Sequence, residues 1–375
     1  MSKSQAAIEN LVVYGIAIAI ITAAVVALYL LGVFSPSNYI SPNTVSGFTG
    51  LAVSQTCIPG GALVVTIENI KSYPIEILWI NTTGLINSNM SKNASFSSVL
   101  QTGQSQIFFV LNSCPKASSA RYSSSVRINY LTGNSINPGP FLSKGTISGE
   151  STSSFTPEKV AYFDGPTSYE PCGSATSTCT YINSTVPLSG RNLSYTMVAW
   201  INTPGYVSGN SGDDAFFSFS SYAAFSFTST DLNVHTCYND PHSNSLNVVA
   251  NPNTWQFVAV AVRNSSGLLY SFYLDGNSVD TWANNTRDLI SNYVMIGGQF
   301  QQCDSNPFVG EISDAQIYKG YLSPSQINSL YTEGLGGAPL QNAGLVAWWP
   351  LDGNANDYSG NANNGRAINV TWVSP

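Results

Sequence analysis

The sequence predicts a mainly β protein that begins with one long apolar α-helix. Residues 11–34 include no charged side chain, proline or amide. Asn, Ser, Thr, Tyr and Gly are abundant in the rest of the chain, which favours short strands joined by turns. Strand-length alternating runs recur from residue 48 onward. We therefore expect an N-terminal transmembrane-type helix, a small β-sandwich head and a second antiparallel sandwich.

The apolar run at 11–34 is 24 residues long. A helix rises about 1.5 Å per residue, so a run of this length can cross the hydrocarbon core of a bilayer. Lys3 is the basic residue near the run and precedes it, so the remainder of the chain is expected on the outer side of the membrane.

Composition narrows the classes of function. Only 9% of the 375 residues are charged, and the formal net charge is −7. This balance excludes nucleic acid as the expected partner, because such binding needs a basic patch. The length predicts two or three domains. Six cysteines in an exported chain indicate disulfides rather than a redox or metal centre.

A short polar segment precedes the apolar run: Lys3, Ser4, Gln5, Ala6, Ala7, Ile8 and Glu9. This order, with an acid at the fifth position after the Ser4–Gln5 junction, resembles the class III signal peptide of archaeal type IV pilins. The resemblance implies cleavage by a prepilin peptidase between Ser4 and Gln5, which leaves a leader (1–4) and an assembly helix (5–34). It also implies that the amine of Gln5 neutralises Glu9 of a neighbouring subunit. The other interpretation is a plain membrane anchor with Glu9 in the headgroup layer.

After a polar linker at 35–47, residues 48–148 form the predicted head. Five runs of strand length, rich in β-branched and aromatic residues, indicate a small β-sandwich. Cys57 and Cys114 are the cysteines of this block, and we expect them to pair. A Ser/Thr-rich linker follows at 149–156.

The region 157–342 contains, in order, the segments VAYFDGPTSYE, LSYTMVAWINTP, NTWQFVAVAVRNSSGLLYSFYLDGNSVDT and MIGGQFQQCDSNPFVGEISDAQIYKGYLSPSQINSLYTEG. In order and spacing they resemble a laminin-G-like, concanavalin A-like jelly-roll. Asp275-Gly276 predicts a hairpin turn. Ser323 as N-cap, Pro324 after it and Gly334 at the end predict one short helix. Cys172 with Cys179 would close a small loop, and Cys237 would then pair with Cys303.

The C-terminal segment 343–375 poses a topological question. Its sequence AGLVAWWPLDGNANDYSGNANNG resembles the opening strand and loop of the same family, yet it follows the domain. It can complete its own jelly-roll as a circular permutation, insert into a neighbouring subunit, or remain as an exposed stub. We favour completion of its own domain, because the connector is short and an exposed Trp cluster is disfavoured.

Enzymatic chemistry finds little support in the sequence. Glu311 and Asp314 lie three residues apart, which places them on opposite faces of a regular strand, whereas glycoside hydrolysis needs two facing carboxylates. A zinc site at His235, Cys237 and His242 would use a cysteine that we expect in a disulfide. We predict no catalytic activity.

Two kinds of binding site remain. A calcium ion favours clustered carboxylate and amide oxygens, and the loop LDGNANDYSGN offers Asp352, Asn354, Asn356 and Asp357; Asp213-Asp214 is a second acidic pair. The same residues are also ordinary turn formers. The resemblance further implies glycan ligands held by aromatic side chains, for which the candidates are Tyr206, Tyr222, Tyr238 and Trp282.

Eight Asn-x-Ser/Thr sequons permit surface glycosylation; they lie at Asn81, Asn89, Asn93, Asn183, Asn192, Asn264, Asn284 and Asn369. The expected function is that of a structural and adhesive subunit of a type IV pilus-like filament at the cell surface. Its expected partners are other pilin subunits, the membrane before assembly, and a glycan or cell-surface ligand. The alternative is a membrane-anchored, lectin-like protein that does not polymerise.

Overall fold

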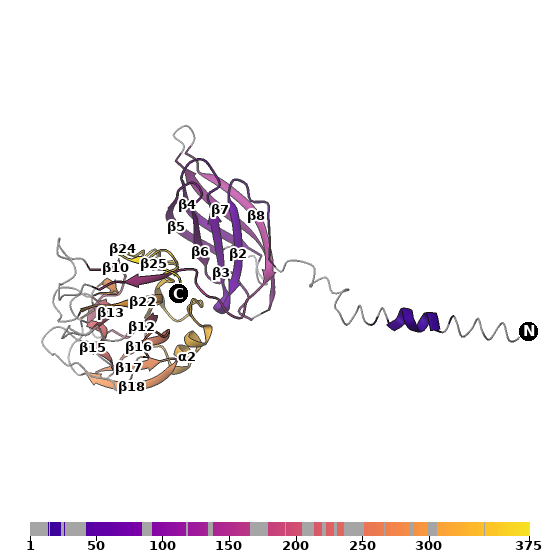
Figure 1. Cartoon of the computed structure of the whole chain (residues 1–375). Coiled ribbons are helices and arrows are strands. Elements are labelled where there is room, and N and C mark those ends of the chain that lie inside the picture. The colour runs from indigo at the N-terminus through magenta and orange to yellow at the C-terminus, as the bar shows by residue number, and fades with distance from the viewer. Residues whose placement is uncertain are drawn as a thin grey trace, which may run out of the picture. The chain divides into compact units, whose positions relative to one another are not determined.

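The structure is a computed structural model of the chain (Figure 1). It describes residues 14, 16–23, 26, 43–84, 92–117, 119–133, 138–165, 179–191, 193–204, 214–219, 223–228, 231–235, 251–265, 267–284, 289–290, 292–298, 306–340 and 342–375. The chain divides into two compact units, Met1–Thr44 and Val45–Pro375.

The described part of the first unit is helical at residues 16–23. Its apolar side chains are more than half exposed, with Ile16 at 57% and Ile18 at 64%. Thr22 donates its hydroxyl to the carbonyl of Ile18 (2.8 Å) and so satisfies its polar group within the helix. Within the described residues, no helix has both the length and the apolar character needed to span a membrane.

The head contains two antiparallel sheets. One has the strand order β1 (Thr44–Ser46), β8 (Phe141–Glu150), β7 (Arg121–Thr132), β4 (Ile75–Thr83) and β5 (Lys92–Leu100). The other has the order β2 (Ala52–Ile58), β3 (Ala62–Glu68) and β6 (Ser105–Val110), with the 3-10 turn η2 (Pro59–Gly61) between β2 and β3. Strict alternation of exposed and buried residues along most of β7 shows why this sequence forms a strand with one face in a core. The predicted head strands are confirmed.

The second sandwich has two larger sheets. One has the order β18 (Asn277–Asn284), β17 (Leu268–Leu274), β16 (Gln256–Asn264), β12 (Tyr195–Asn202), β22 (Gly310–Lys319), β9 (Val160–Phe163) and β25 (Thr371–Val373), with β23 (Leu345–Trp349) also on β22. The other has the order β15 (Asp231–His235), β14 (Ala223–Thr228), β13 (Asp214–Phe219), β20 (Tyr293–Ile296), β10 (Tyr181–Thr185) and β24 (Arg366–Ile368), with β21 (Asn306–Pro307) on β13. The short strands β11 (Gly190–Arg191) and β19 (Leu289–Ile290) pair separately.

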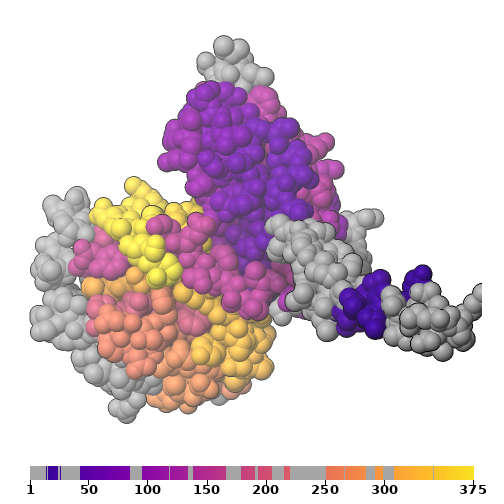
Figure 2. All heavy atoms as spheres, turned by 45° about the vertical axis from the view of Figure 1, so that its right-hand side comes forward, coloured from indigo at the N-terminus to yellow at the C-terminus, as the bar shows by residue number. Residues whose placement is uncertain are grey.

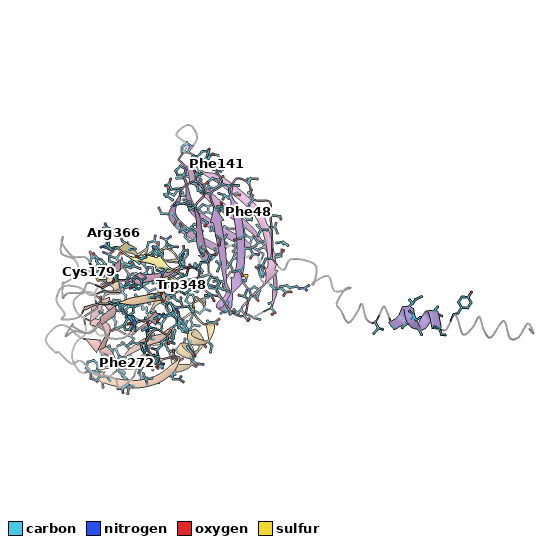
Figure 3. All side chains as sticks on the ribbon, viewed as in Figure 1. Phe48, Phe141, Cys179, Phe272, Trp348 and Arg366 are labelled. Carbon is cyan, nitrogen blue, oxygen red and sulfur yellow. A yellow bond between two sulfur atoms is a disulfide. The ribbon has the colours of Figure 1, made fainter. Side chains whose placement is uncertain are left out.

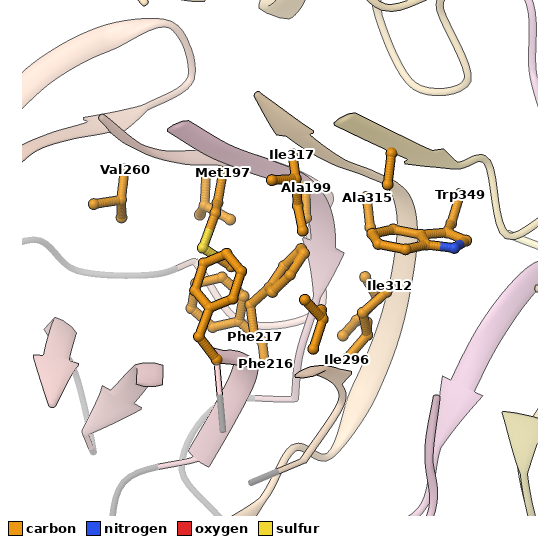
Figure 4. Close-up of a cluster of buried hydrophobic side chains, with 14 of the residues drawn as sticks. Met197, Ala199, Phe216, Phe217, Val260, Ile296, Ile312, Ala315, Ile317 and Trp349 are labelled. Carbon is orange, nitrogen blue, oxygen red and sulfur yellow. The ribbon is translucent and has the colours of Figure 1, made fainter. Parts of the chain in front are cut away.

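Apolar side chains from the inner faces of both sheets form the core of this sandwich. Figure 4 shows Met197 of β12, Phe217 of β13, Ile312 of β22 and Trp349 of β23 directed into one layer. Each is 3% exposed or less. Burial of apolar area on this scale is the main source of stability for such a sandwich.

In the described part of the second unit, the α-helix α2 (Pro324–Glu333) covers the outer face of the larger sheet. Ser323 caps it: the Ser323 amide donates to the Gln326 side chain (2.9 Å), and the Ser323 hydroxyl accepts from the Gln326 amide (3.4 Å). Tyr331 stacks on Trp200 with ring centroids 5.9 Å apart. The predicted N-cap and the predicted Pro at the first helical position are confirmed.

The C-terminal segment 343–375 supplies three strands to this sandwich. β23 pairs with β22, β24 pairs with β10, and β25 pairs with β9. β24 is an edge strand of one sheet and β25 is an edge strand of the other. The segment therefore lies in its own chain's sandwich, and Figure 2 shows its residues, in yellow, on the molecular surface.

The same segment also enters the core of the head. Trp348 and Tyr358 each pack against Phe109 of β6, with ring centroids 5.1 Å apart in both pairs. Tyr358 donates its hydroxyl to the carbonyl of Ile107 (2.9 Å), and Asn356 donates its amide to Ser98 (2.9 Å). The adjacent residues Trp348 and Trp349 are both 0% exposed and belong to different cores. Head and jelly-roll are therefore parts of one compact unit.

Candidate functional site

A β-bulge in β22 changes the arrangement that the sequence predicts for Glu311 and Asp314. Asp314 has a positive φ of 53°, and the register between β12 and β22 shifts at this point. Ile312 and Ala315 both belong to the sandwich core, so two residues between them lie where a regular strand has one. Glu311 and Asp314 consequently lie on the same face, and the prediction of opposite faces is wrong.

The two carboxyl groups nevertheless differ in their surroundings. Glu311 is half-buried and accepts a hydrogen bond from the Asn202 amide (2.9 Å). Asp314 is 3% exposed and lies beneath Trp348, whose indole N–H donates to its Oδ1. Asp314 is therefore placed as a structural group rather than as one that a polymer substrate can reach. The prediction of no catalytic activity stays a prediction.

Asp314 belongs to a buried polar chain. The side-chain amide of Gln316 donates to Oδ2 of Asp314 (3.0 Å). The hydroxyl of Tyr318 donates to the side-chain oxygen of Gln316 (2.5 Å) and accepts from the backbone amide of Leu340 (3.0 Å). Burial raises the pKa of Asp314 to about 8, although the hydrogen bonds from Trp348 and Gln316 lower it.

The loop predicted to bind calcium is held together by hydrogen bonds. Oδ1 of Asp357 accepts from the amides of Trp348 (3.0 Å) and Ser359 (2.8 Å); Oδ2 accepts from the Ser359 hydroxyl (2.9 Å) and the Asn363 amide (2.8 Å). Four donors use all the lone pairs of this carboxylate. The loop thereby fixes the path of the chain between β23 and β24.

The other predicted calcium ligands are engaged in the same way. Asp352 accepts from the backbone amides of Lys159 (2.7 Å) and Glu158 (3.3 Å). Burial raises the pKa of Asp352 to about 6. Asn354 accepts from the amide of Asn356 (3.0 Å). Across the part of the chain that the structure describes, no three His, Cys, Asp or Glu side chains are grouped as a metal site.

Of the predicted glycan-contacting aromatics, Trp282 is described. It is half-buried and packs on Tyr270, with ring centroids 5.1 Å apart, at the margin of the sandwich core. Tyr206, Tyr222 and Tyr238 lie outside the described residues. Trp282 thus contributes to packing, with only part of its ring free for a ligand.

A different polar and aromatic face, which the sequence analysis missed, lies on the outer side of the smaller jelly-roll sheet. We call it the Tyr293 face; it comprises Tyr181, Asn183, Thr185, Tyr293 and Arg366, together with the buried Met295, which lies opposite Asn183 and packs against Tyr181. Tyr293 is 53% exposed and lies opposite Thr185, while Arg366 lies opposite Asn183. Figure 3 shows Arg366 at the edge of this sheet.

The Tyr293 face combines groups that suit a sugar. A tyrosine ring can stack on a pyranose, and hydroxyl, amide and guanidinium groups can hydrogen-bond to its hydroxyls. The alternation in β10 (YINST) and β20 (YVMI) could have indicated this face. The second and fourth residues of both strands are less than a tenth exposed, so the first and third residues lie on the opposite side of the sheet. The contribution of Arg366 depends on the pairing of β24 with β10, which the local pattern does not contain.

Comparison with known proteins assigns part of the chain to a family. Residues 176–328 match the family model described as concanavalin A-like lectin/glucanases superfamily. This region is a concanavalin A-like domain. Strand β9 and the C-terminal strands of the same sandwich lie outside the matched residues. No curated protein matches the chain.

Solved structures resemble the chain at low identity. A protein from Bacteroides ovatus described as carbohydrate-binding is 14% identical, with 89% of this chain and 93% of that chain covered and a TM-score of 0.47. A heptameric SAP-like pentraxin from Limulus polyphemus is 14% identical (58% and 95% covered, TM-score 0.40). Domain 4 of an extracellular arabinanase from Geobacillus stearothermophilus, in complex with arabinotriose, is 17% identical (46% and 81% covered, TM-score 0.33).

The disulfide predicted in the head is present. Cys57 and Cys114 are bonded, with their Cα atoms 5.7 Å apart. In the concanavalin A-like domain, Cys179 is also disulfide-bonded. The remaining predicted disulfide residues lie outside the described part: Cys172, Cys237 and Cys303.

The sequons fall in different environments. Asn264 is exposed at the end of β16, whereas Asn81 is 8% exposed within β4. Asn369 donates its amide to the carbonyl of Cys179 (3.3 Å), and Asn183 is half-buried in the Tyr293 face. The side chains of the other four lie outside the described part: Asn89, Asn93, Asn192 and Asn284.

Several further predicted residues also lie outside the described part. They are Ser4, Gln5 and Glu9 of the N-terminal segment, Asp213, Cys237 and His242, and the side chains of Asp214 and His235. The predicted cleavage, the Gln5–Glu9 interaction and the zinc alternative therefore stay predictions.

Proposed function

We propose that this protein is an adhesive subunit of a type IV pilus-like surface filament, whose concanavalin A-like domain binds a glycan. The N-terminal helix joins subunits, and the second unit carries the binding face. Before assembly the helix lies in the membrane, and after assembly the protein belongs to an extracellular filament.

The family match at residues 176–328 supports the glycan-binding part of the proposal, because this superfamily includes lectins. The Tyr293 face is the best candidate for the contact surface. It has an exposed aromatic ring on a rigid sheet, beside amide, hydroxyl and guanidinium groups. Sites of this composition hold sugars by stacking and by hydrogen bonds at fixed positions.

A glycan array with the full chain, with and without calcium, tests the binding. Tyr293→Ala should weaken binding about tenfold or more, because the stacking contact is lost. Tyr293→Phe keeps the ring and should retain most of the affinity. If the wild type binds no glycan with or without calcium, or if Tyr293→Ala binds as tightly as the wild type, the Tyr293 face is not a glycan-binding surface.

The N-terminal residues support the filament part of the proposal. Lys3 to Glu9 resemble a class III signal peptide, and an apolar helix follows. Among its described residues, Ile16, Ile18 and Ile20 are more than half exposed in the single chain. Apolar surface of this extent is stable only in hydrocarbon or against other helices.

Mass spectrometry of the mature N-terminus tests processing. A chain that begins at Gln5 supports the filament role. A chain that keeps Met1 or Ser2 favours the alternative, a membrane-anchored lectin-like protein that does not polymerise.

Electron microscopy of a Glu9→Ala variant tests assembly. Filaments should be lost while membrane insertion is kept, because an apolar span inserts without the acid. Asn10→Ala is the neighbouring control and should still assemble. Normal filaments in Glu9→Ala cells would contradict the role of Glu9.

A further inference from the structure

Two cations lie directly opposite each other on the outer face of the head. Arg127 of β7 and Lys144 of β8 are cross-strand partners, and both are exposed. Like charges at directly opposed positions of an antiparallel pair destabilise the sheet. The chain has 13 Lys and Arg residues in total and a net charge of −7. Within the described residues neither cation has an ion-pair partner, which indicates that an anion completes the face.

The nearest ion pair does not neutralise this charge. Within the described residues, the ion pair of this sheet joins Arg121 to Glu150 (3.1 Å). It lies at the start of β7 and the end of β8, away from Arg127 and Lys144 in the middle of these strands. Glu76 is on the same face but accepts a hydrogen bond from Ser97 (3.0 Å) and is opposite Leu131. It therefore lies two rows of residues away from Arg127.

Aromatic and amide side chains lie on the β4 side of the two cations. Asn81 lies opposite Arg127 on its other side, in β4. In the adjacent row of the same face, Trp79 lies opposite Asn129, which lies opposite Leu142. A register shift between Ile77 and Trp79 leaves the half-buried Trp79 outside the core of the head. Residues two apart on a strand share a face, so Trp79 and Arg127 are diagonal neighbours.

We propose that this surface, the Arg127 face, binds an acidic polysaccharide. A carboxylate or sulfate group would lie between Arg127 and Lys144, and one sugar ring would pack on Trp79. The Asn129 amide nitrogen donates to the carbonyl of Phe141 (3.1 Å), and its side-chain oxygen would accept from sugar hydroxyl groups. Charge complementarity favours an anion, and the tryptophan with flanking amides favours a sugar. A membrane surface or a nucleic acid would require a larger basic cluster. The Arg127 face belongs to the head, so this proposal is independent of the Tyr293 face.

Binding of the full chain to polygalacturonate, measured by calorimetry at low and high salt, tests this proposal. Dextran is the uncharged control polymer. The Arg127→Gln/Lys144→Gln variant should bind about tenfold or more weakly at low salt, since two charge contacts are lost. Trp79→Ala should weaken binding at both salt concentrations, because stacking is little screened. Arg121→Gln removes the same charge from the same strand and should leave binding unchanged.

A second variant separates binding from folding. Lys144→Glu replaces the like-charged pair with an Arg–Glu pair, so it should abolish binding while the melting temperature stays equal or rises. Equal affinity of the wild type and the double Gln variant for polygalacturonate would overturn the proposal. So would binding to phosphatidylglycerol vesicles but not to polygalacturonate, which would identify the face as a membrane contact.

Discussion

Asp314 shows how one residue links three parts of the chain. It lies at the β22 bulge, accepts from Trp348 of the C-terminal segment, and connects through Gln316 and Tyr318 to the amide of Leu340. A buried acid of this kind is stable only while its polar atoms are paired. Because burial outweighs the two donors, the pKa of Asp314 rises to about 8.

The raised pKa predicts a pH dependence of stability. The folded chain holds the Asp314 proton more tightly than the unfolded chain between pH 3.8 and about 8, so stability is full below this window and falls as pH rises through it. Asp314→Asn should flatten the curve of melting temperature against pH. Asp280→Asn, at an exposed position, should not; identical curves for wild type and Asp314→Asn would contradict the prediction.

At the scale of elements, the sequence predicts the features that depend on neighbouring residues and does not predict those that depend on pairing between distant strands. Alternation marks β7, and the Ser323 cap with Pro324 marks α2, because their causes lie within a few residues. The bulge at Asp314 depends on how β12 and β22 are registered. The candidate binding faces also depend on strand pairing. The sequence predicts single aromatic residues as ligand contacts, whereas Arg127 and Lys144 lie side by side only because β7 pairs with β8.

The C-terminal segment was the least predictable element. The sequence allows three placements and favours completion of the chain's own jelly-roll, which is where β23, β24 and β25 pair. Nothing in the sequence predicts that the same segment also packs into the core of the head. Tyr358 and its acceptor Ile107 are 251 residues apart, a contact that no local pattern contains.

Deletion of residues 343–375 should prevent both sandwiches from reaching a stable fold. The deletion removes three buried aromatic side chains, Trp348, Trp349 and Tyr358, and each large-to-small loss of this kind costs about 3–5 kcal/mol. It also leaves β9 and β10 as open edges. Circular dichroism and thermal melting check this. A truncated chain that is monomeric and as stable as the full chain would show that the segment is dispensable.

A milder change isolates the contact with the head. Tyr358→Phe removes the hydroxyl that donates to Ile107 and should cost about 1–3 kcal/mol, because the carbonyl then lacks its partner. Tyr293→Phe, at an exposed site, should cost much less. Chemical denaturation with a constant slope would measure both; equal losses would argue against a special role for Tyr358.

For the whole molecule, the shared core predicts that head and jelly-roll unfold together. Trp348 lies in the core of the head, and the next residue, Trp349, lies in the core of the jelly-roll. Scanning calorimetry of the second unit within the full chain should therefore show one main transition. Trp348→Ala should lower its midpoint and separate it into two, whereas Trp282→Ala should lower it without separation. Two well-resolved transitions in the wild type would contradict this prediction.

The position of β24 and β25 at the sheet edges has a consequence for biosynthesis. Both strands follow every other strand that the structure describes, so the ribosome makes them after their partners β10 and β9. Neither sheet can gain its final edge during synthesis of the preceding residues. A product of early termination keeps open edges, which proteases and chaperones recognise in unfinished proteins. The placement of these two strands thus makes synthesis of residues 366–373 a condition of folding.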